Sequence, residues 1–139
     1  MRKLPLIARI LLGLIFFASG LMGLLNLVPA PPNLPEKLQA FMTGLMATGY
    51  FFPLLKCTEV ICGLLLLIGA FVPLALVVLA PVILNILMVH LFLEHGGLPL
   101  ALFICALEIY LAFFASPYKE IVRQLFRCPM KEAMDAKKA

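Results

Sequence analysis

Long apolar runs limit what this chain can fold into more than any other feature. The first covers residues 6–28 and is interrupted by Arg9 and by a few small or amide residues. A run of this length matches the roughly 20 residues that a helix needs to cross a bilayer. Later runs predict helices at about residues 53–71, 74–93 and 98–115. We therefore predict an all-α integral membrane protein with a bundle of four transmembrane helices.

The composition agrees with lipid as the main solvent of this chain. Charged residues make up only 13% of the sequence and hydrophobic residues 64%, whereas a soluble globular domain has about 25% charged residues. The net charge of +4 comes mostly from the N-terminus and the last quarter of the chain. Basic residues so placed orient membrane helices and meet anionic headgroups, so we expect no nucleic-acid binding.

The N-terminus raises the question of a secretory signal, because Arg2 and Lys3 precede the first apolar run. That run is too long for a typical signal. The nearby small-residue site around Ala30 is followed directly by Pro31. We expect the first helix to be retained.

A proline-rich segment separates the first two long helices. Pro29, Pro31, Pro32 and Pro35 break any helix. Apolar residues then recur at three- and four-residue spacing in a stretch too short to span, which predicts an interfacial helix at about 35–48.

We expect residues 1–116 to form the transmembrane domain and residues 117–139 a basic cytoplasmic tail with a segment amphipathic enough to lie on the membrane. The positive-inside rule and an even number of spans place both termini in the cytoplasm.

Four charged residues fall inside the apolar runs: Arg9, Lys56, Glu59 and Glu108. Intramembrane charges usually face the bundle interior and pair. At about 1.5 Å per residue, Arg9 lies roughly 5 Å and Glu108 roughly 12 Å from the same membrane face. We predict an Arg9–Glu108 ion pair, with a structural role favoured over a functional one.

A second polar cluster is expected in the outer half, formed by Glu59, Lys56, His90 and Asn26. An acid and a histidine in an apolar pocket can relay protons or hold a polar headgroup such as a quinone ring. The alternative is that these residues only hold helices together. For Asn85 a helix–helix hydrogen bond is favoured over a ligand contact.

The cysteines predict neither a redox centre nor a metal site. Cys57, Cys62 and Cys105 lie within predicted helices, and no CxxC motif or metal-ligand spacing involves them or Cys128. There is also no haem-attachment or flavin motif. We therefore expect no intrinsic cofactor, and any role in electron transfer requires a partner or a diffusible quinone.

Three segments together resemble the DoxX family. They are Arg9 with the apolar run to Ser19-Gly20-Leu21, the stretch from Glu59-Val60-Ile61-Cys62-Gly63 to Gly69, and His90 near the end of the third helix. The resemblance spans residues 6–114. It implies a four-helix membrane bundle in the bacterial cytoplasmic membrane, with Arg9, Glu59 and His90 as the family's polar positions.

The function that this resemblance implies is broad. Some members of the family are described as small membrane subunits linked to quinone reduction, others are linked to thiol redox complexes, and distant relatives act as membrane chaperones. One departure is that many members carry a lysine a few residues after the first-helix glycine, where residues 21–26 have none. Lys56 is a candidate to replace it.

We therefore carry two hypotheses forward. The first is a redox-associated membrane subunit that binds a quinone or a similar amphiphile, with a redox partner subunit. The second is a non-enzymatic scaffold or assembly factor. A transporter is disfavoured because the sequence has no inverted repeat. The oligomeric state is open, a homo-oligomer included.

Overall fold

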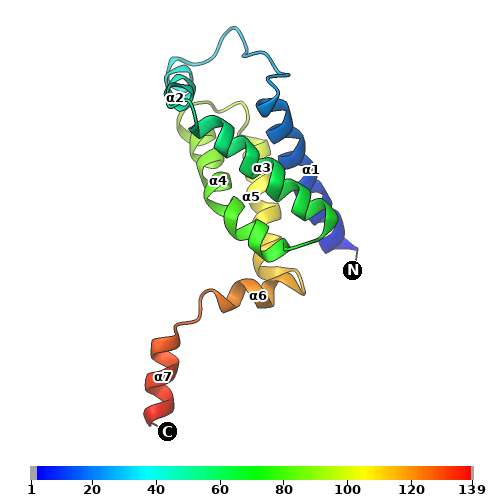
Figure 1. Cartoon of the computed structure of the whole chain (residues 1–139), viewed down its shortest axis with the longest axis vertical. Coiled ribbons are helices and arrows are strands. Elements are labelled where there is room, and N and C mark those ends of the chain that lie inside the picture. Colours follow the sequence, from blue (N-terminus) through cyan, green and yellow to red (C-terminus); the bar gives the residue numbers. More distant parts are fainter. Residues whose placement is uncertain (1–2, 139) are drawn as a thin grey trace.

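The computed structural model describes residues 3–138, and every regular element in that range is helical (Figure 1). Arg2, which contributes to the predicted orientation, lies outside the described residues. The elements are α1 (Leu4–Leu24), α2 (Glu36–Ala47), α3 (Phe51–Ile68), α4 (Val72–Phe92), α5 (Leu98–Ile109), the π-helical turn η1 (Tyr110–Phe114), α6 (Tyr118–Gln124) and α7 (Pro129–Lys138).

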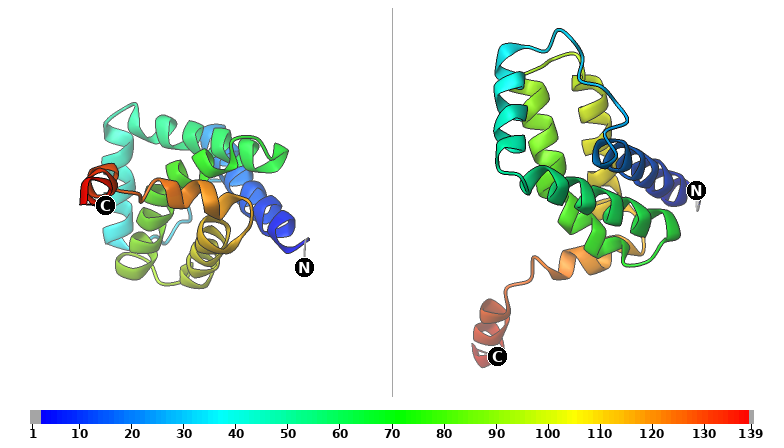
Figure 2. Two further views of the ribbon diagram at one scale, coloured as in Figure 1. Left: turned by 90° about the horizontal axis from the view of Figure 1, so that it is seen from below. Right: turned by 45° about the horizontal axis from the view of Figure 1, so that its top comes forward.

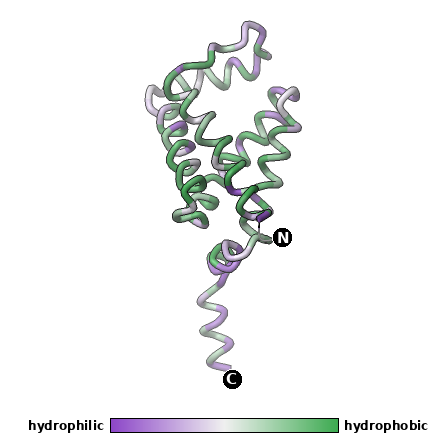
Figure 3. Tube along the Cα trace, turned by 90° about the vertical axis from the view of Figure 1, so that its right-hand side faces the viewer, coloured by the Kyte–Doolittle hydropathy of each residue, from purple (hydrophilic) through white to green (hydrophobic). Residues whose placement is uncertain are grey.

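Three of these helices, α1, α3 and α4, are long and apolar enough to cross a membrane. The segment α5–η1 with α6 is a fourth candidate if this pair, which is bent by 82°, counts as one span. Figure 3 shows apolar residues along the helices of the bundle, and hydrophilic residues gathered in the loop before α2 and in the C-terminal tail. The described residues thus contain three or four candidate spans.

The helix ends follow local chain chemistry. The first helix ends at Leu24 rather than at residue 28, because Asn26 adopts a left-handed backbone with a φ of 52°. Asparagine is one of the few residues other than glycine that takes this conformation readily. Gly69, with a φ of 77°, ends α3 in the same way.

The α1–α3 contact is the most extensive in the described residues and depends on glycine. A Cβ atom added at Gly63 would lie 2.9 Å from the Gly13 carbonyl oxygen and 2.5 Å from the Phe17 backbone nitrogen. Helix pairs in membranes commonly approach through such small residues. The buried core beside this contact includes Leu12, Phe16, Leu66, Leu76, Leu79 and Leu111.

The tail divides into two parts with different environments. Helix α6 crosses the end of the bundle where the N-terminus also lies (Figure 2), and its Val122 is only 4% exposed. Helix α7 projects away from the bundle and buries none of its residues. The apolar residues that suggested a membrane-surface segment therefore lie partly against the bundle.

Candidate functional site

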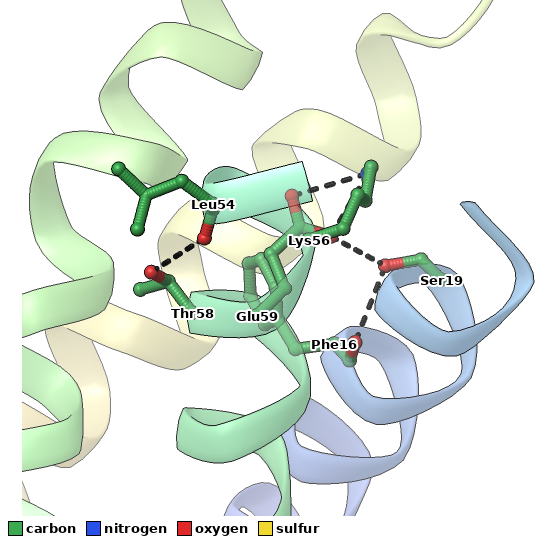
Figure 4. Close-up of polar contacts among 6 residues, drawn as sticks. All are labelled: Phe16, Ser19, Leu54, Lys56, Thr58 and Glu59. Atoms are coloured by element: carbon green, nitrogen blue, oxygen red, sulfur yellow. Dashed lines mark hydrogen bonds and ion pairs between the residues drawn. The ribbon is translucent and has the colours of Figure 1, made fainter. Parts of the chain in front are cut away.

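Glu59 in α3 is the most buried charged residue of the described chain, with 2% of its surface exposed. Lys56 donates through Nζ to both of its carboxylate oxygens, at 3.2 Å and 2.9 Å. Ser19 of α1 donates through Oγ to Oε2 at 3.3 Å (Figure 4). Because the partners come from both helices, this Glu59 cluster links α1 to α3.

Local geometry explains the direction of the Lys56 side chain. Residues three apart in a helix lie on the same face, which brings Lys56 over Glu59. A Cβ atom at Gly23 of α1 would lie 2.7 Å from Lys56 Cδ, so glycine makes the space for the lysine stem. The lysine therefore lies against α1 and neutralises Glu59.

His90 does not join the Glu59 cluster. Its Nδ1 lies 2.8 Å from the Ile86 carbonyl oxygen, and its Nε2 lies 3.8 Å from Glu94 Oε2. A carbonyl can only accept, so Nδ1 is the protonated nitrogen in this contact. Within residues 3–138, no hydrogen bond or ion pair joins His90 to Glu59 or Lys56. His90 thus interacts with its own helix end, where Glu94 also accepts from the Gly96 and Gly97 amides.

Asn26 lies beside the Glu59 cluster without bonding to it. It lines a cavity of about 180 Å³ together with Gly23, Met46 and Phe52. Gly23 also contacts the Lys56 stem, so this small cavity adjoins the lysine. Of the four residues predicted to form the outer site, the structure joins Lys56 and Glu59 directly and places Asn26 next to them.

The predicted Arg9–Glu108 ion pair is not formed. Arg9 donates through Nη1 to the Tyr118 hydroxyl of α6 at 3.2 Å. Its guanidinium group also lies against Gly69, in the turn between α3 and α4. Glu108 lies deeper, and its buried Oε2 has no hydrogen-bond partner in the described chain. Residue counting placed both side chains in the same half of the membrane, but Arg9 bonds to Tyr118 of α6 instead of Glu108.

Glu108 lines a large cavity instead. The cavity has a volume of about 490 Å³ and lies between α4, α5–η1 and α6. Glu108 is 8% exposed and is the one charged residue that lines it. Its other lining residues are apolar, and they include Leu76, Ile83, Leu87, Ala112, Val122 and Phe126.

A family model described as DoxX matches residues 4–96, which is more than half of the chain. The chain belongs to the DoxX family. Comparison with curated proteins and with solved structures finds no match. The family that the sequence motifs indicated is thereby confirmed.

The match to DoxX divides the polar residues of this chain into two sets. Arg9, Ser19, Lys56, Glu59 and His90 lie within the matched residues 4–96. Glu108 lies beyond them, so the large cavity combines α4 of the matched region with α5, η1 and α6 outside it. The cavity of this DoxX protein is thus partly built from a region that the family model does not cover.

The π-helical turn η1 follows Glu108 directly and contributes Ala112 and Phe113 to the cavity wall. Such turns are rare and occur frequently at functional sites. A carboxyl group donates a hydrogen bond when protonated and accepts one when ionised. An unpartnered carboxyl in an apolar cavity can therefore bind one polar group of an otherwise apolar ligand.

The sequence contained one signal for this cavity that our prediction did not use. Val122, Leu125 and Phe126 all line it, and they follow the Ser116-Pro117 break after the last apolar run. We interpreted them as a membrane-surface stripe. Their position beside α4 and η1 depends on the bend before α6, which local sequence does not specify.

Neither cysteines nor metal ligands gather at these sites. All four cysteines are free, and Cys105 lines the large cavity as a small side chain. Residues 3–138 contain no group of three or more His, Cys, Asp or Glu side chains that could hold a metal ion.

Proposed function

We propose that this DoxX-family protein is an accessory subunit of a membrane redox system and binds a quinone or a similar amphiphile. The observation that carries the proposal is the cavity beside Glu108. Its volume of about 490 Å³ falls within the range of small-molecule sites, about 300–1,000 Å³. Such sites are mostly apolar with a few placed polar groups.

The lining favours a ligand with an uncharged head. No basic side chain contributes to the cavity in the described part of the chain, so an anionic head would meet Glu108 without a countercharge. A quinone carbonyl can accept from a protonated carboxyl, and a quinol hydroxyl can donate to an ionised one. The isoprenoid or alkyl tail of such a molecule would contact the apolar walls.

Electron transfer in this proposal belongs to a partner subunit. Reduction of a quinone needs electrons and protons, and Glu108 can exchange only protons. The partner would carry the redox centre, while this chain would hold the amphiphile at a fixed depth in the membrane.

We also propose how the chain lies in the membrane. Four spans, α1, α3, α4 and α5–η1, would cross a bacterial cytoplasmic membrane with both termini in the cytoplasm, and α2 would lie in the outer interface. The position of α6 beside the N-terminal end of α1 supports this placement, because Arg9 bonds to Tyr118 there. Basic residues such as Lys3 and Lys119 would then face the cytoplasm.

The outer polar residues provide a second location for the ligand. If the ligand binds here, Glu59, Lys56 and Asn26 would be the ligand or proton-relay residues, and His90 would have to act from its position at the end of α4. The small cavity lined by Asn26, next to Lys56, supports it. Its volume of about 180 Å³ is enough for part of a headgroup only.

The rival function is a scaffold or assembly factor. It is favoured by the Glu59 cluster, where the charges satisfy each other and join two helices. Under this alternative, substitutions throughout the bundle would change stability or partner binding, and none would change binding of an amphiphile.

Filling the cavity tests the proposal directly. Ala80 lines the cavity and is exposed, so Ala80→Phe should occupy it without disturbing the core. The matched control is Ala106→Phe, at an exposed position of α5 that does not line the cavity.

We expect wild type and Ala106→Phe to bind a short-tailed quinone analogue in detergent titrations. We expect Ala80→Phe to bind about tenfold more weakly or not at all, since the ligand and the added ring compete for one volume. Native mass spectrometry of protein purified from its own membrane should show the matching loss of a bound amphiphile. Equal binding by both variants would refute the site.

A further inference from the structure

One face of α4 carries a regular stripe of exposed residues. Its members alternate at spacings of four and three, which is the heptad pattern of the seam between two packed helices. None of them is covered by another part of the described chain. They are Leu74, Val78, Pro81, Asn85, Met88 and Phe92.

Asn85 distinguishes this stripe from an ordinary lipid-facing surface. It lies seven residues before the end of α4 (Val72–Phe92), which is about 10 Å into the apolar layer. Its side chain is exposed and makes no hydrogen bond within residues 3–138. The helix–helix hydrogen bond expected from the sequence is therefore not made inside this chain. In lipid, an amide without a partner is costly because no water can satisfy it.

We propose that the stripe binds a second copy of this chain, with the two α4 helices side by side and their Asn85 side chains hydrogen-bonded to each other. An amide both donates and accepts, so two copies of it are complementary. A two-fold axis along the membrane normal places any residue at the same depth in both copies. Asn85 then meets Asn85.

The pattern also specifies the form of the contact. Heptad spacing produces left-handed packing with a crossing angle of about +20°, the common geometry of membrane helix pairs. A single asparagine in such a seam sets register and oligomeric state. Leu74, Val78 and Met88 would pack above and below it.

The contact is separate from the proposed ligand site. The α4 residues that line the large cavity, among them Ala80, Ile83 and Leu87, are not members of the stripe. The proposed contact and the proposed ligand site therefore use different residues of α4. The inference therefore stands whether or not the chain binds an amphiphile.

The test is dimerisation of purified full-length protein in lipid vesicles, measured by energy transfer between labelled copies across a range of protein-to-lipid ratios. We expect wild type to dimerise and Asn85→Ala to dimerise about tenfold more weakly, since it loses the reciprocal hydrogen bonds. The control is Leu91→Ala, an α4 position that is 38% exposed and lies off the stripe. It should dimerise like wild type.

Cross-linking keeps the proposal testable if Asn85→Ala folds poorly. In a background with Cys57→Ser and Cys128→Ser, oxidation should trap dimers through Val78→Cys and not through Leu91→Cys. A wild type that stays monomeric at every ratio would overturn the proposal, as would equal weakening by Asn85→Ala and Leu91→Ala. If Val78→Cys in native membranes cross-links only to a different protein, this face of α4 binds another partner. That result would also overturn the proposal.

Discussion

Two buried glutamates of this DoxX protein have opposite surroundings. Glu59, between α1 and α3, accepts hydrogen bonds from Lys56 and Ser19. Glu108 of α5 has a buried oxygen without a partner and lines a cavity of about 490 Å³ between α4, α5–η1 and α6. The first region is closely packed around glycines, and the second borders an open cavity.

The contrast separates two uses of the same residue type. A buried carboxylate whose partners all come from its own chain contributes to holding the helices together, and breaking its pair is costly. A buried carboxyl without partners is a cost to folding unless something else satisfies it. The comparison favours a structural role for Glu59. Under the proposed function, Glu108 contacts the ligand, and the outer location that includes Glu59 is the less favoured one.

The largest effect on stability is expected at Glu59. Replacing it by leucine leaves the Lys56 ammonium without its partner in a mostly buried site, since 18% of that side chain is exposed. We expect Glu59→Leu to lower the free energy of unfolding by about 3 kcal/mol. Unfolding by SDS titration in mixed micelles measures the change.

Two variants control this experiment. The double variant Glu59→Leu with Lys56→Leu should recover most of the loss, because removing both charges leaves no unpaired ion. Thr58→Val should cost little, since the Thr58 hydroxyl bonds only to the Leu54 carbonyl of its own helix. If Glu59→Leu is as stable as wild type, the structural assignment is wrong.

A smaller effect is expected where α6 joins α1. Tyr118→Phe removes the hydroxyl that accepts from Arg9 and should cost about 1 kcal/mol. Because α6 forms one wall of the cavity, we expect faster hydrogen exchange at the amides of residues 122–124 and little change in α3. Unchanged exchange in α6 would mean that this bond does not hold α6 in place.

The sequence predicted the features that depend on local patterns. Apolar run lengths located α1, α3, α4 and the start of α5. The proline-rich segment and the apolar spacing after it located α2. The contact between Lys56 and Glu59 also follows from their spacing along one helix. Family membership rested on motifs in the same region.

The features that the sequence did not predict depend on how each helix is rotated about its own axis and on tertiary packing. Residue counting gives a depth in the membrane but not the direction in which a side chain extends from its helix. Depth alone pairs Arg9 with Glu108, whereas in the structure Arg9 bonds to Tyr118, and His90 contacts its own helix end. The cavity depends on α6 packing against the bundle, and Asn85 is exposed because α4 turns that face outward.

The most direct test of the contrast is one experiment on Glu108→Leu that measures both stability and binding of a short-tailed quinone analogue. We expect the variant to be at least as stable as wild type, because an unpartnered buried carboxyl is removed. We expect binding to weaken about tenfold, with Glu108→Gln in between because its amide still donates and accepts. A Glu108→Leu protein that loses several kcal/mol of stability and binds the analogue like wild type would contradict the account.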